Sequence, residues 1–435
     1  MPATLKVSRS NESAKAQPRE FALFAQAGAT DGEVQLEALQ RIVGEYGAKD
    51  NTSSLPEGSA EFEQVASALQ RPATHTDAEG SGNCLGFAAR DSGGALSPYR
   101  FKRRDPTPDD VVIQIAFCGI CHSDLHQIKN EWGQSEYPMI PGHEVVGIVT
   151  QVGDNVKDFK VGDYAGVGCL VNSCQSCKNC KKGWENYCHT PVYTYNSRDA
   201  DGTMTMGGYS SHVVVDRKFA LHVPSNLPLD AAAPLLCAGI TTYSPIRHFG
   251  LDKPGTKLGV VGLGGLGHMA VQFGKAFGCV VTVISTSPNK KEEALSVLGA
   301  DHFLVSKDEE AMKAAAGTLD GIIDTVSAKH AFDPYLGLLD TDGKLVLVGL
   351  PEEPIQLVPF SIVAGRKMVS GSSIGGIKET QEMLDFCGEH NITCHIERIP
   401  VDYVNEAMKR LEKNDVKYRF SIDIQGTLIA GNQKQ

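Results

Sequence analysis

The sequence predicts an α/β protein in which a doubly wound parallel sheet accompanies a β-rich lobe, behind an N-terminal extension. Three observations carry this prediction. The chain has 435 residues, more than one hydrophobic core usually serves, so two folded domains are expected. Apolar strands alternate with helical stretches from about residue 255 to 371, which favours a parallel sheet. Short β-rich runs broken by Gly, Pro and Asp fill the region before it.

Residues 1–82 form the N-terminal extension, which is rich in Ala, Glu, Gln and Ser. Apolar residues at helical spacing predict two short helices, one after Thr30 with the capping partner Glu33 and one after Ser59. Residues 74–82 have the composition of a linker. Because two short helices bury little apolar surface, we expect them to dock on the main body or stay mobile, without a catalytic role.

The two folded domains are expected to share the rest of the chain. The β-rich domain occupies 83–240, with strands at 111–115 and 145–149. The parallel sheet occupies 241–374, and its apolar runs are 258–261, 280–284, 321–324 and 345–348. Residues 375–426 return to mixed helix and strand, and we expect them to rejoin the β-rich domain, leaving 427–435 as a tail.

Composition argues against several functions. The formal net charge of −11 would repel a phosphate backbone, so nucleic acid is not an expected partner. No apolar run approaches the roughly 20 residues of a membrane-spanning helix, so no membrane role is expected. Twelve cysteines without a secretory signal indicate a reducing compartment, and we expect a cytoplasmic protein. Basic residues among the first twenty leave organelle targeting open, although Glu12 and Glu20 count against it.

Four cysteines follow a spacing typical of a structural zinc site. Cys174-x-x-Cys177-x-x-Cys180-x7-Cys188 places four thiols within fifteen residues. A loop of this kind can wrap one tetrahedral zinc with no open coordination position, so the metal would stabilise the domain and do no chemistry. Reduced, inert cysteines or a redox switch remain the alternatives.

Three distant segments offer further metal-ligand types. They contain Cys121, the pair His143-Glu144, and Cys237. Catalytic zinc sites draw their ligands from distant segments and leave one position open for substrate. Each segment alone is weak evidence, because a single buried Cys is commonly a small core hydrophobe. Their occurrence together with the cysteine loop favours a catalytic metal site.

A glycine-rich turn predicts a dinucleotide site. The run Gly262-Leu263-Gly264-Gly265-Leu266-Gly267 follows an apolar strand and opens a helix expected to reach about Phe277. In this context the glycines let the backbone approach a pyrophosphate at a helix N-terminus. A plain glycine-rich turn is the alternative.

The end of the second strand indicates which cofactor binds. An acidic residue there would hold the ribose 2′-hydroxyl of NADH and repel a 2′-phosphate. The chain instead has Ser285-Thr286-Ser287, followed by Lys291. Hydroxyl groups and a cation suit a phosphate, so we expect NADP(H). Lys291 could equally be a solvated surface charge.

Residues 85–426 resemble the zinc-dependent medium-chain alcohol dehydrogenases, above all their cinnamyl alcohol dehydrogenase branch. The resemblance rests on Gly119–His126, Pro141–Glu144, the four-cysteine loop and Leu235–Thr241. It implies a Rossmann domain beside a GroES-like catalytic domain, two zinc ions per chain and NADP. It further implies a homodimer that pairs through the nucleotide-binding sheets, although a tetramer stays open.

The resemblance also implies roles for single residues. Cys121, His143 and Cys237 would bind the catalytic zinc, Glu144 would be an alternating acidic ligand, and Asp124 would orient His143. Ser123 and His126 would relay the proton, with the cofactor ribose between them. The cofactor contacts would be Thr241, Gly262, Gly264, Gly265, Leu266, Gly267, Ser285, Thr286, Ser287 and Lys291. Structural roles are expected for Cys84, Cys118, Cys169, Cys279, Cys387 and Cys394, and His122 is expected to be an ordinary surface or core histidine.

The implied activity is the interconversion of primary alcohols and aldehydes. Trp132, Tyr193 and Ser373 would line the substrate pocket, and the small Ser373 removes a wall that a large aromatic forms in the lignin-forming enzymes. A broad range of aromatic and aliphatic aldehydes is therefore expected, although pocket aromatics can equally be ordinary core. The alternatives are a catalytically silent, zinc-stabilised binding protein on the same fold and a zinc-free quinone reductase. The complete ligand and relay sets disfavour both.

Overall fold

The computed structural model describes residues 78–351 and 353–429. The two helices predicted in the extension lie outside the described residues. In the described part of the chain, no helix is long and apolar enough to cross a membrane. The predicted linker ends in a short strand, β1 (Glu79–Gly80), which pairs with Tyr99–Arg100. Pairing of two residues needs no side-chain pattern, so the sequence did not reveal it.

The β-rich region contains three sheets. A three-stranded sheet has the order β1-β3-β2. A seven-stranded sheet has the order β10-β6-β5-β4-β18-β17, and β9 also pairs with β4. Strands β7 and β8 form a separate ribbon. Their bounds are β2 Cys84–Ala89, β3 Leu96–Phe101, β4 Asp110–Ile120, β5 Val145–Val152, β6 Tyr164–Val167, β7 Leu170–Asn172, β8 Val192–Tyr193, β9 His212–Asp216, β10 Leu221–His222, β17 Ile396–Pro400 and β18 Arg419–Asp423.

The second region is a six-stranded sheet in which all neighbouring strands are parallel. Its order is β13-β12-β11-β14-β15-β16, which is the 3-2-1-4-5-6 order of a doubly wound dinucleotide-binding sheet. The strands are β11 Lys257–Val261, β12 Val280–Ser285, β13 His302–Val305, β14 Leu319–Asp324, β15 Leu339–Leu347 and β16 Met368–Gly371. The predicted strands are present, although β15 begins earlier than expected because a polar turn at 340–343 interrupts its apolar pattern.

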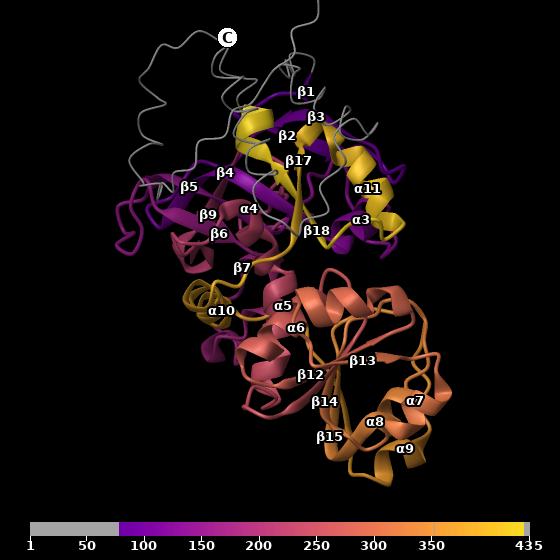
Figure 1. Ribbon diagram of the computed structural model, residues 1–435. Coiled ribbons are helices and arrows are strands. Elements are labelled where there is room, and N and C mark those ends of the chain that lie inside the picture. The colour runs from indigo at the N-terminus through magenta and orange to yellow at the C-terminus, as the bar shows by residue number, and fades with distance from the viewer. Residues whose placement is uncertain (1–77, 352, 430–435) are drawn as a thin grey trace, which may run out of the picture. The chain divides into compact units, whose positions relative to one another are not determined.

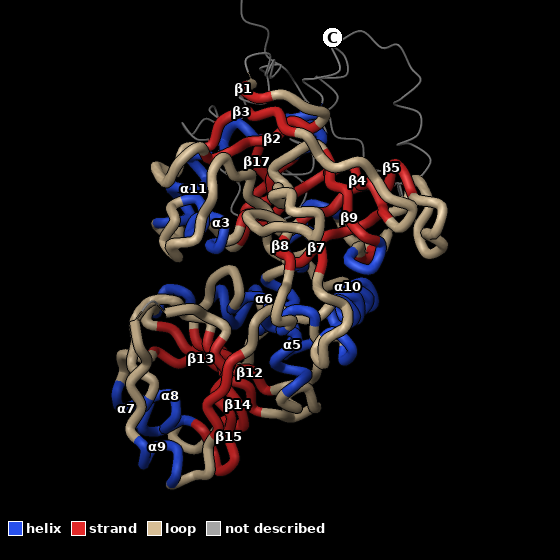
Figure 2. Tube along the Cα trace, turned by 180° about the vertical axis from the view of Figure 1, so that it is seen from behind, coloured by secondary structure: helices blue, strands red, loops and turns tan. Residues whose placement is uncertain are grey.

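Helices cover both faces of the parallel sheet. Helices α5 and α6 lie on one face, and α7, α8 and α9 lie on the other (Figures 1 and 2). Side chains alternate along a strand, so β11 contributes to a core on each face of the sheet. Leu258 and Val260 belong to the core that includes α5 and α6, and Val261 belongs to the core that includes α7 and α8. The helices are α3 His122–Ile128, α4 Leu229–Ala232, α5 Ala238–His248, α6 Gly267–Ala276, α7 Glu309–Ala314, α8 Asp333–Leu338, α9 Pro359–Val363, α10 Ile377–His390 and α11 Val404–Glu412. The predicted helix after the glycine turn is confirmed as α6.

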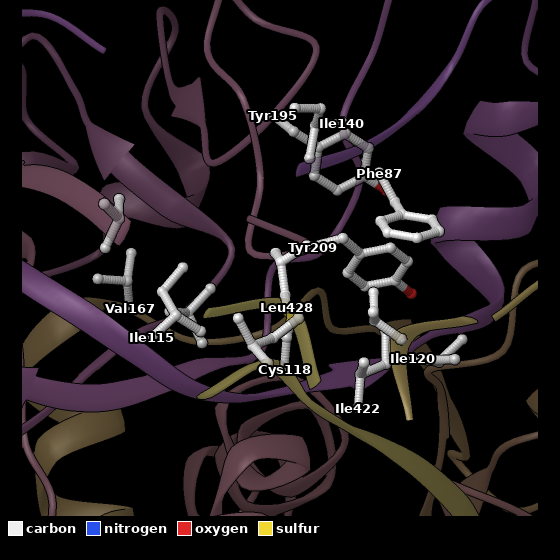
Figure 3. Packing of buried hydrophobic residues seen from close by; sticks show 14 of the residues in the cluster. Phe87, Ile115, Cys118, Ile120, Ile140, Val167, Tyr195, Tyr209, Ile422 and Leu428 are labelled. Carbon is white, nitrogen blue, oxygen red and sulfur yellow. The ribbon is translucent and has the colours of Figure 1, made fainter. Parts of the chain in front are cut away.

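The tail strand β18 lies antiparallel beside β4, with Phe420 opposite Ile120 and Ile422 opposite Cys118. Both strands contribute to one core, in which the rings of Phe87, Tyr195 and Tyr209 gather beside Ile140 (Figure 3). Residues about 300 positions apart therefore share this core. The domain boundaries predicted at 82, 240, 374 and 426 stay predictions.

Candidate metal centre and nucleotide site

Four potential metal ligands meet although they come from three distant segments. Cys121 lies between β4 and α3, His143 and Glu144 precede β5, and Cys237 precedes α5. One ligand atom from each side chain lies within 4.8 Å of those of the other three. All four residues are buried, and Cys121 is the most accessible at 8%. The fold thus brings together the ligands expected from the sequence.

Strand pairing sets the position of Glu144. Because β4 and β5 are antiparallel neighbours, the Gly119 N–H reaches the Glu144 carbonyl at 3.0 Å. A Cβ at position 119 would overlap the Glu144 carboxylate. Glycine is required at this position because the acidic side chain crosses directly over the backbone of the neighbouring strand.

Asp124 holds the connecting segments around the cluster. Its carboxylate accepts the Cys121 N–H, the Gly142 N–H and the Tyr209 hydroxyl, each at 3.0 Å. The Nδ1 atom of His143 lies 3.6 Å from Asp124 Oδ1, which is too long for a direct hydrogen bond. Asp124 therefore stabilises the loop that carries His143, and its effect on the imidazole is electrostatic.

The donor set fits a zinc ion. His143 Nε2 and Glu144 Oε2 are among the few buried side-chain atoms without a hydrogen-bond partner in the described part of the chain. The sulfurs of Cys121 and Cys237 lie 3.9 Å apart. A tetrahedron with zinc–sulfur bonds of about 2.3 Å has edges of about 3.8 Å. Two thiols, an imidazole and a carboxylate at these separations form a pocket of the size and chemistry that zinc prefers.

Arg419, which no sequence motif identified, forms a buried ion pair with Glu144. The guanidinium contacts Glu144 Oε1, and both side chains are almost completely buried. Burial raises the pKa of the Glu144 carboxyl, and the Arg419 guanidinium opposes this shift by favouring the carboxylate. Arg419 occupies a polar position in a strand that alternates apolar and polar residues, so its spacing alone did not mark it as a site residue.

Cys169 also lies beside these four ligands. We expected a structural role for it, because no other metal-ligand residue stands near it at a spacing typical of a metal site. Hydrogen bonding with the Cys237 thiol lowers the pKa of Cys169 to about 6, and His143 acts in the same direction. The thiol thus contacts two of the expected ligands. Only the fold reveals this neighbour, because it joins residues 26 and 68 positions apart.

The four cysteines of the loop also converge. Their sulfurs are separated by 3.4 Å between Cys174 and Cys188, 3.5 Å between Cys177 and Cys180, 3.8 Å between Cys174 and Cys180, and 3.9 Å between Cys177 and Cys188. These separations again approach the edges of a zinc–sulfur tetrahedron. All four corners are thiols, so the set leaves no position for substrate.

The glycine turn lies between β11 and α6, where the strand order of the sheet reverses. Gly262 has a φ of +88°, which disfavours other residues. A Cβ on Gly267 would collide with the Gly262 carbonyl, whereas one on Gly264 would meet no atom within 4 Å. The turn is therefore tight on its inner side and open at Gly264, as a phosphate-binding turn requires. Leu266 caps α6, and Thr241 lies one helical turn after Cys237 on α5.

Lys290, which was not predicted as a site residue, lies in the 3-10 turn after β12 and reaches back to the glycine turn. The ammonium of Lys290 lies 2.8 Å from the Leu263 carbonyl, at the start of the glycine turn. Ser285 Oγ accepts the Ser287 N–H at 3.2 Å, and Thr286 and Lys291 are exposed. The sequence does not show which of the adjacent residues Lys290 and Lys291 reaches the glycine turn. Only the fold shows that it is Lys290.

Ser123 and His126 lie three residues apart on α3 and therefore face the same side of this helix. The His126 Nδ1 atom contacts the carboxylate of Glu131. The Trp132 ring stacks on the imidazole at a centroid distance of 5.3 Å. Glu131 is thus a second residue that sequence reasoning missed, and it fixes the ring of His126 from the solvent side.

The three residues expected at the substrate pocket are accessible. Trp132 is 45% exposed and Tyr193 is 47% exposed, which excludes the alternative that they belong to the core. Burial raises the pKa of Tyr193, and the neighbouring Cys169 acts in the same direction. Ser373 is also exposed and follows the end of β16.

A dinucleotide-binding sheet combined with a cluster of zinc-ligand side chains is characteristic of metal-dependent dehydrogenases. Two family models match the chain: the alcohol dehydrogenase GroES-like domain over residues 107–225 and the zinc-binding dehydrogenase over residues 265–389. The chain is 63% identical over 343 residues to a probable mannitol dehydrogenase from Fragaria ananassa, covering 79% of this chain and 96% of that protein.

Two solved structures are similar. A cinnamyl alcohol dehydrogenase from Sorghum bicolor superposes with a TM-score of 0.77 at 56% identity, covering 79% of this chain and 99% of that one. A cinnamyl alcohol dehydrogenase from Helicobacter pylori, solved with NADP(H), gives a TM-score of 0.74 at 44% identity with the same coverage. The chain belongs to the zinc-binding medium-chain alcohol dehydrogenases, in their cinnamyl alcohol dehydrogenase-like branch. It is an alcohol and aldehyde oxidoreductase, and the silent binding protein and the quinone reductase are not supported.

We predict that Arg419→Met destabilises the protein strongly, because it leaves the Glu144 carboxylate buried without its cation. Breaking one side of a buried ion pair typically costs about 3–5 kcal/mol. Urea unfolding should show this loss, and adding Glu144→Gln should recover part of it. The control is Arg366→Met, which breaks an exposed pair with Asp342 and should unfold close to wild type. Wild-type stability in Arg419→Met would contradict the role given to the buried pair.

Proposed function

We propose that the chain is a zinc-dependent NADP(H) oxidoreductase that interconverts primary alcohols and aldehydes. The observation that carries this proposal is the convergence of Cys121, His143, Glu144 and Cys237 within 4.8 Å. Two thiols, an imidazole and a carboxylate with unpartnered atoms form a catalytic rather than a purely structural set, because one corner can be given up to substrate.

A zinc ion held there would supply positive charge that stabilises negative charge developing on the substrate oxygen. Within this proposal Cys121, His143 and Cys237 are the constant ligands. Glu144 is the ligand that exchanges, since Arg419 can hold its carboxylate when it leaves the cluster. The four cysteines from Cys174 to Cys188 hold a second, structural ion.

Two side chains on α3, Ser123 and His126, would relay the proton of the reaction. Ser123 lies beside the Cys121 sulfur at 3.6 Å and is placed to exchange a proton with the substrate oxygen. His126 lies one turn further along, and its contact with Glu131 gives the path an end near solvent. A histidine suits this role because one ring nitrogen can donate a proton while the other accepts one.

The cofactor would bind at the glycine turn with its 2′-phosphate at the end of β12. The hydroxyls of Ser285, Thr286 and Ser287 and the positive charges of Lys290 and Lys291 suit an anion. The Helicobacter pylori relative, which binds NADP(H), supports this preference. In this proposal Trp132, Tyr193 and Ser373, which are all exposed, border the substrate. The small Ser373 side chain favours a broad range of aromatic and aliphatic aldehydes over one dedicated substrate.

We also propose that the protein is a homodimer that pairs through its parallel sheets. Strand β16 is an edge strand, and its region carries exposed apolar side chains. They are Leu350, Ile355, Val358, Phe360, Val363 and Met368, and Phe360 is 75% exposed. Exposed apolar residues gathered along a sheet edge indicate an interface. The cytoplasmic location predicted from the cysteines stays a prediction.

Removing metal ligands should separate the two zinc sites. Metal analysis of the wild type should give two zinc ions per chain. Cys121→Ser should lose one ion and its turnover while remaining folded. Cys188→Ala opens the other tetrahedron and should first lower thermal stability, because structural zinc stabilises the folded state. A Cys121→Ser variant that keeps substantial turnover with one zinc would refute the assignment of the catalytic site.

Steady-state kinetics with a panel of aldehydes should show a preference for NADPH over NADH. The double variant Ser285→Asp with Lys291→Ala should shift the efficiency ratio toward NADH by at least tenfold, or roughly 1.4 kcal/mol, because an acid beside the 2′-phosphate adds repulsion. Single variants Lys290→Met and Lys291→Met should show which ammonium binds the phosphate, and we expect the larger loss at Lys290. A wild type that prefers NADH would reverse the cofactor assignment.

The homodimer predicts that charge at the sheet edge dissociates the protein. The variant Phe360→Asp with Val363→Asp should sediment with half the mass of the wild type. The control is Val161→Asp, since Val161 is 62% exposed but lies before β6 in the β-rich region. If both variants keep the wild-type mass, the apolar edge is not the interface.

A further inference from the structure

The loop that carries the four cysteines also holds the chain where it leaves the parallel sheet. The Asn186 side chain donates to the Ser373 carbonyl at 2.8 Å, and the Ser373 N–H donates to the Tyr187 hydroxyl at 3.1 Å. The Glu185 carboxylate accepts the Ile377 N–H at 3.0 Å, at the first residue of α10. We call Glu185, Asn186 and Tyr187 the clamp and residues 372–376 the crossover.

The backbone of the crossover has a conformation that its own residues oppose. Ile374 has a φ of +44°, which is unfavourable for a β-branched residue. A Cβ at Gly376 would collide with the Gly183 carbonyl, so the crossover passes in direct contact with the cysteine loop. Ile374 packs against two hydrophobic cores, the one that includes β4 and the one that includes α5. External contacts must therefore maintain this conformation. The clamp supplies two of them at Ser373 and a third at Ile377, directly after the crossover.

The clamp itself is anchored by the cysteine loop. Tyr187 immediately precedes Cys188, and the Asn179 side chain donates to the Tyr187 carbonyl. The Cys188 sulfur lies 3.4 Å from that of Cys174 and 3.9 Å from that of Cys177. Closure of the four thiols therefore fixes where Asn186 and Tyr187 meet the crossover.

We propose that the clamp determines substrate preference by fixing the backbone of Ser373 at the wall of the substrate pocket. This inference rests on the proposed function, in which Ser373 borders the substrate. Because serine is small, the main chain at this position forms much of the wall, and its displacement changes the pocket directly. The cysteine loop then acts on substrate selection and not only on stability, with Asn186 and Tyr187 as positioning residues.

The test compares the double variant Asn186→Ala with Tyr187→Phe, and both single variants, with Asn226→Ala. The control removes a matched bond, because Asn226 donates at 2.8 Å to the Gly388 carbonyl near the other end of α10. Amide hydrogen exchange at Ser373 measures the clamp without any substrate. Kinetics give the ratio of kcat/KM for cinnamaldehyde to that for propanal, and metal analysis verifies that both zinc ions are retained.

With both zinc ions retained, the double variant should exchange the Ser373 amide at least about tenfold faster and change the selectivity ratio at least about fivefold, as expected for lost hydrogen bonds. Each single variant should give part of both effects, and Asn226→Ala neither. Unchanged exchange at Ser373, or faster exchange with an unchanged ratio, would overturn the proposal. A wild type that reduces no aldehyde would instead refute the proposed function, and the assignment of substrate preference with it, while the exchange result would still report on the clamp.

Discussion

The buried pair of Arg419 and Glu144 joins three parts of the protein that the chain order separates. Arg419 begins the tail strand β18, whereas Glu144 belongs to the metal cluster, 275 residues earlier. The same arginine lies against the nucleotide turn, because a Cβ on Gly265 would come within 3.1 Å of its side chain. A buried charge without its partner is costly in free energy. If the segment that carries Glu144 moved away from β18, one of the two charges would be left unpaired in an apolar environment, so the pair fixes the position of the metal ligands relative to β18.

Neighbouring contacts hold Arg419 in this position. Tyr418 stacks on His268 at a centroid distance of 4.7 Å, and its hydroxyl donates to Glu293 at 3.1 Å. The His268 Nδ1 atom lies 3.2 Å from the Gly264 carbonyl, while its Nε2 accepts the His395 N–H at 3.3 Å. Burial lowers the pKa of His268 to about 3, so the ring is neutral and donates through one nitrogen while it accepts through the other. The uncharged side chain of His268 thereby links the glycine turn, which would receive the cofactor phosphates, to Tyr418, the residue just before Arg419 and β18.

The sequence predicted those parts of the fold and site that depend on local patterns. The four-cysteine loop was predictable because its thiols lie within fifteen residues, and the glycine turn because it follows a strand and opens α6. Cys121, His143, Glu144 and Cys237 were grouped by their occurrence together with the cysteine loop, and their individual roles came from the family resemblance, since their spacing along the chain does not show that they meet. Arg419, Cys169, Lys290 and Glu131 were missed for the same reason. The role of each residue depends on a contact with a partner that strand pairing, helix packing or a turn brings close. Spacing along the sequence does not encode such contacts.

Charge explains why a metal ion should stabilise the packing around the four-ligand cluster. Cys121 and Cys237 would bind a metal as thiolates, and Glu144 and Asp124 add carboxylates in the same buried region. Arg419 balances one negative charge. The remaining charges must be neutralised by protons or by a cation, because several like charges in a dry interior repel each other strongly. A divalent ion removes this repulsion and uses the unpartnered atoms of His143 and Glu144 at the same time. The arrangement that would make the site catalytic is therefore also one in which a bound ion would stabilise the surrounding packing, although the fold would not depend on it.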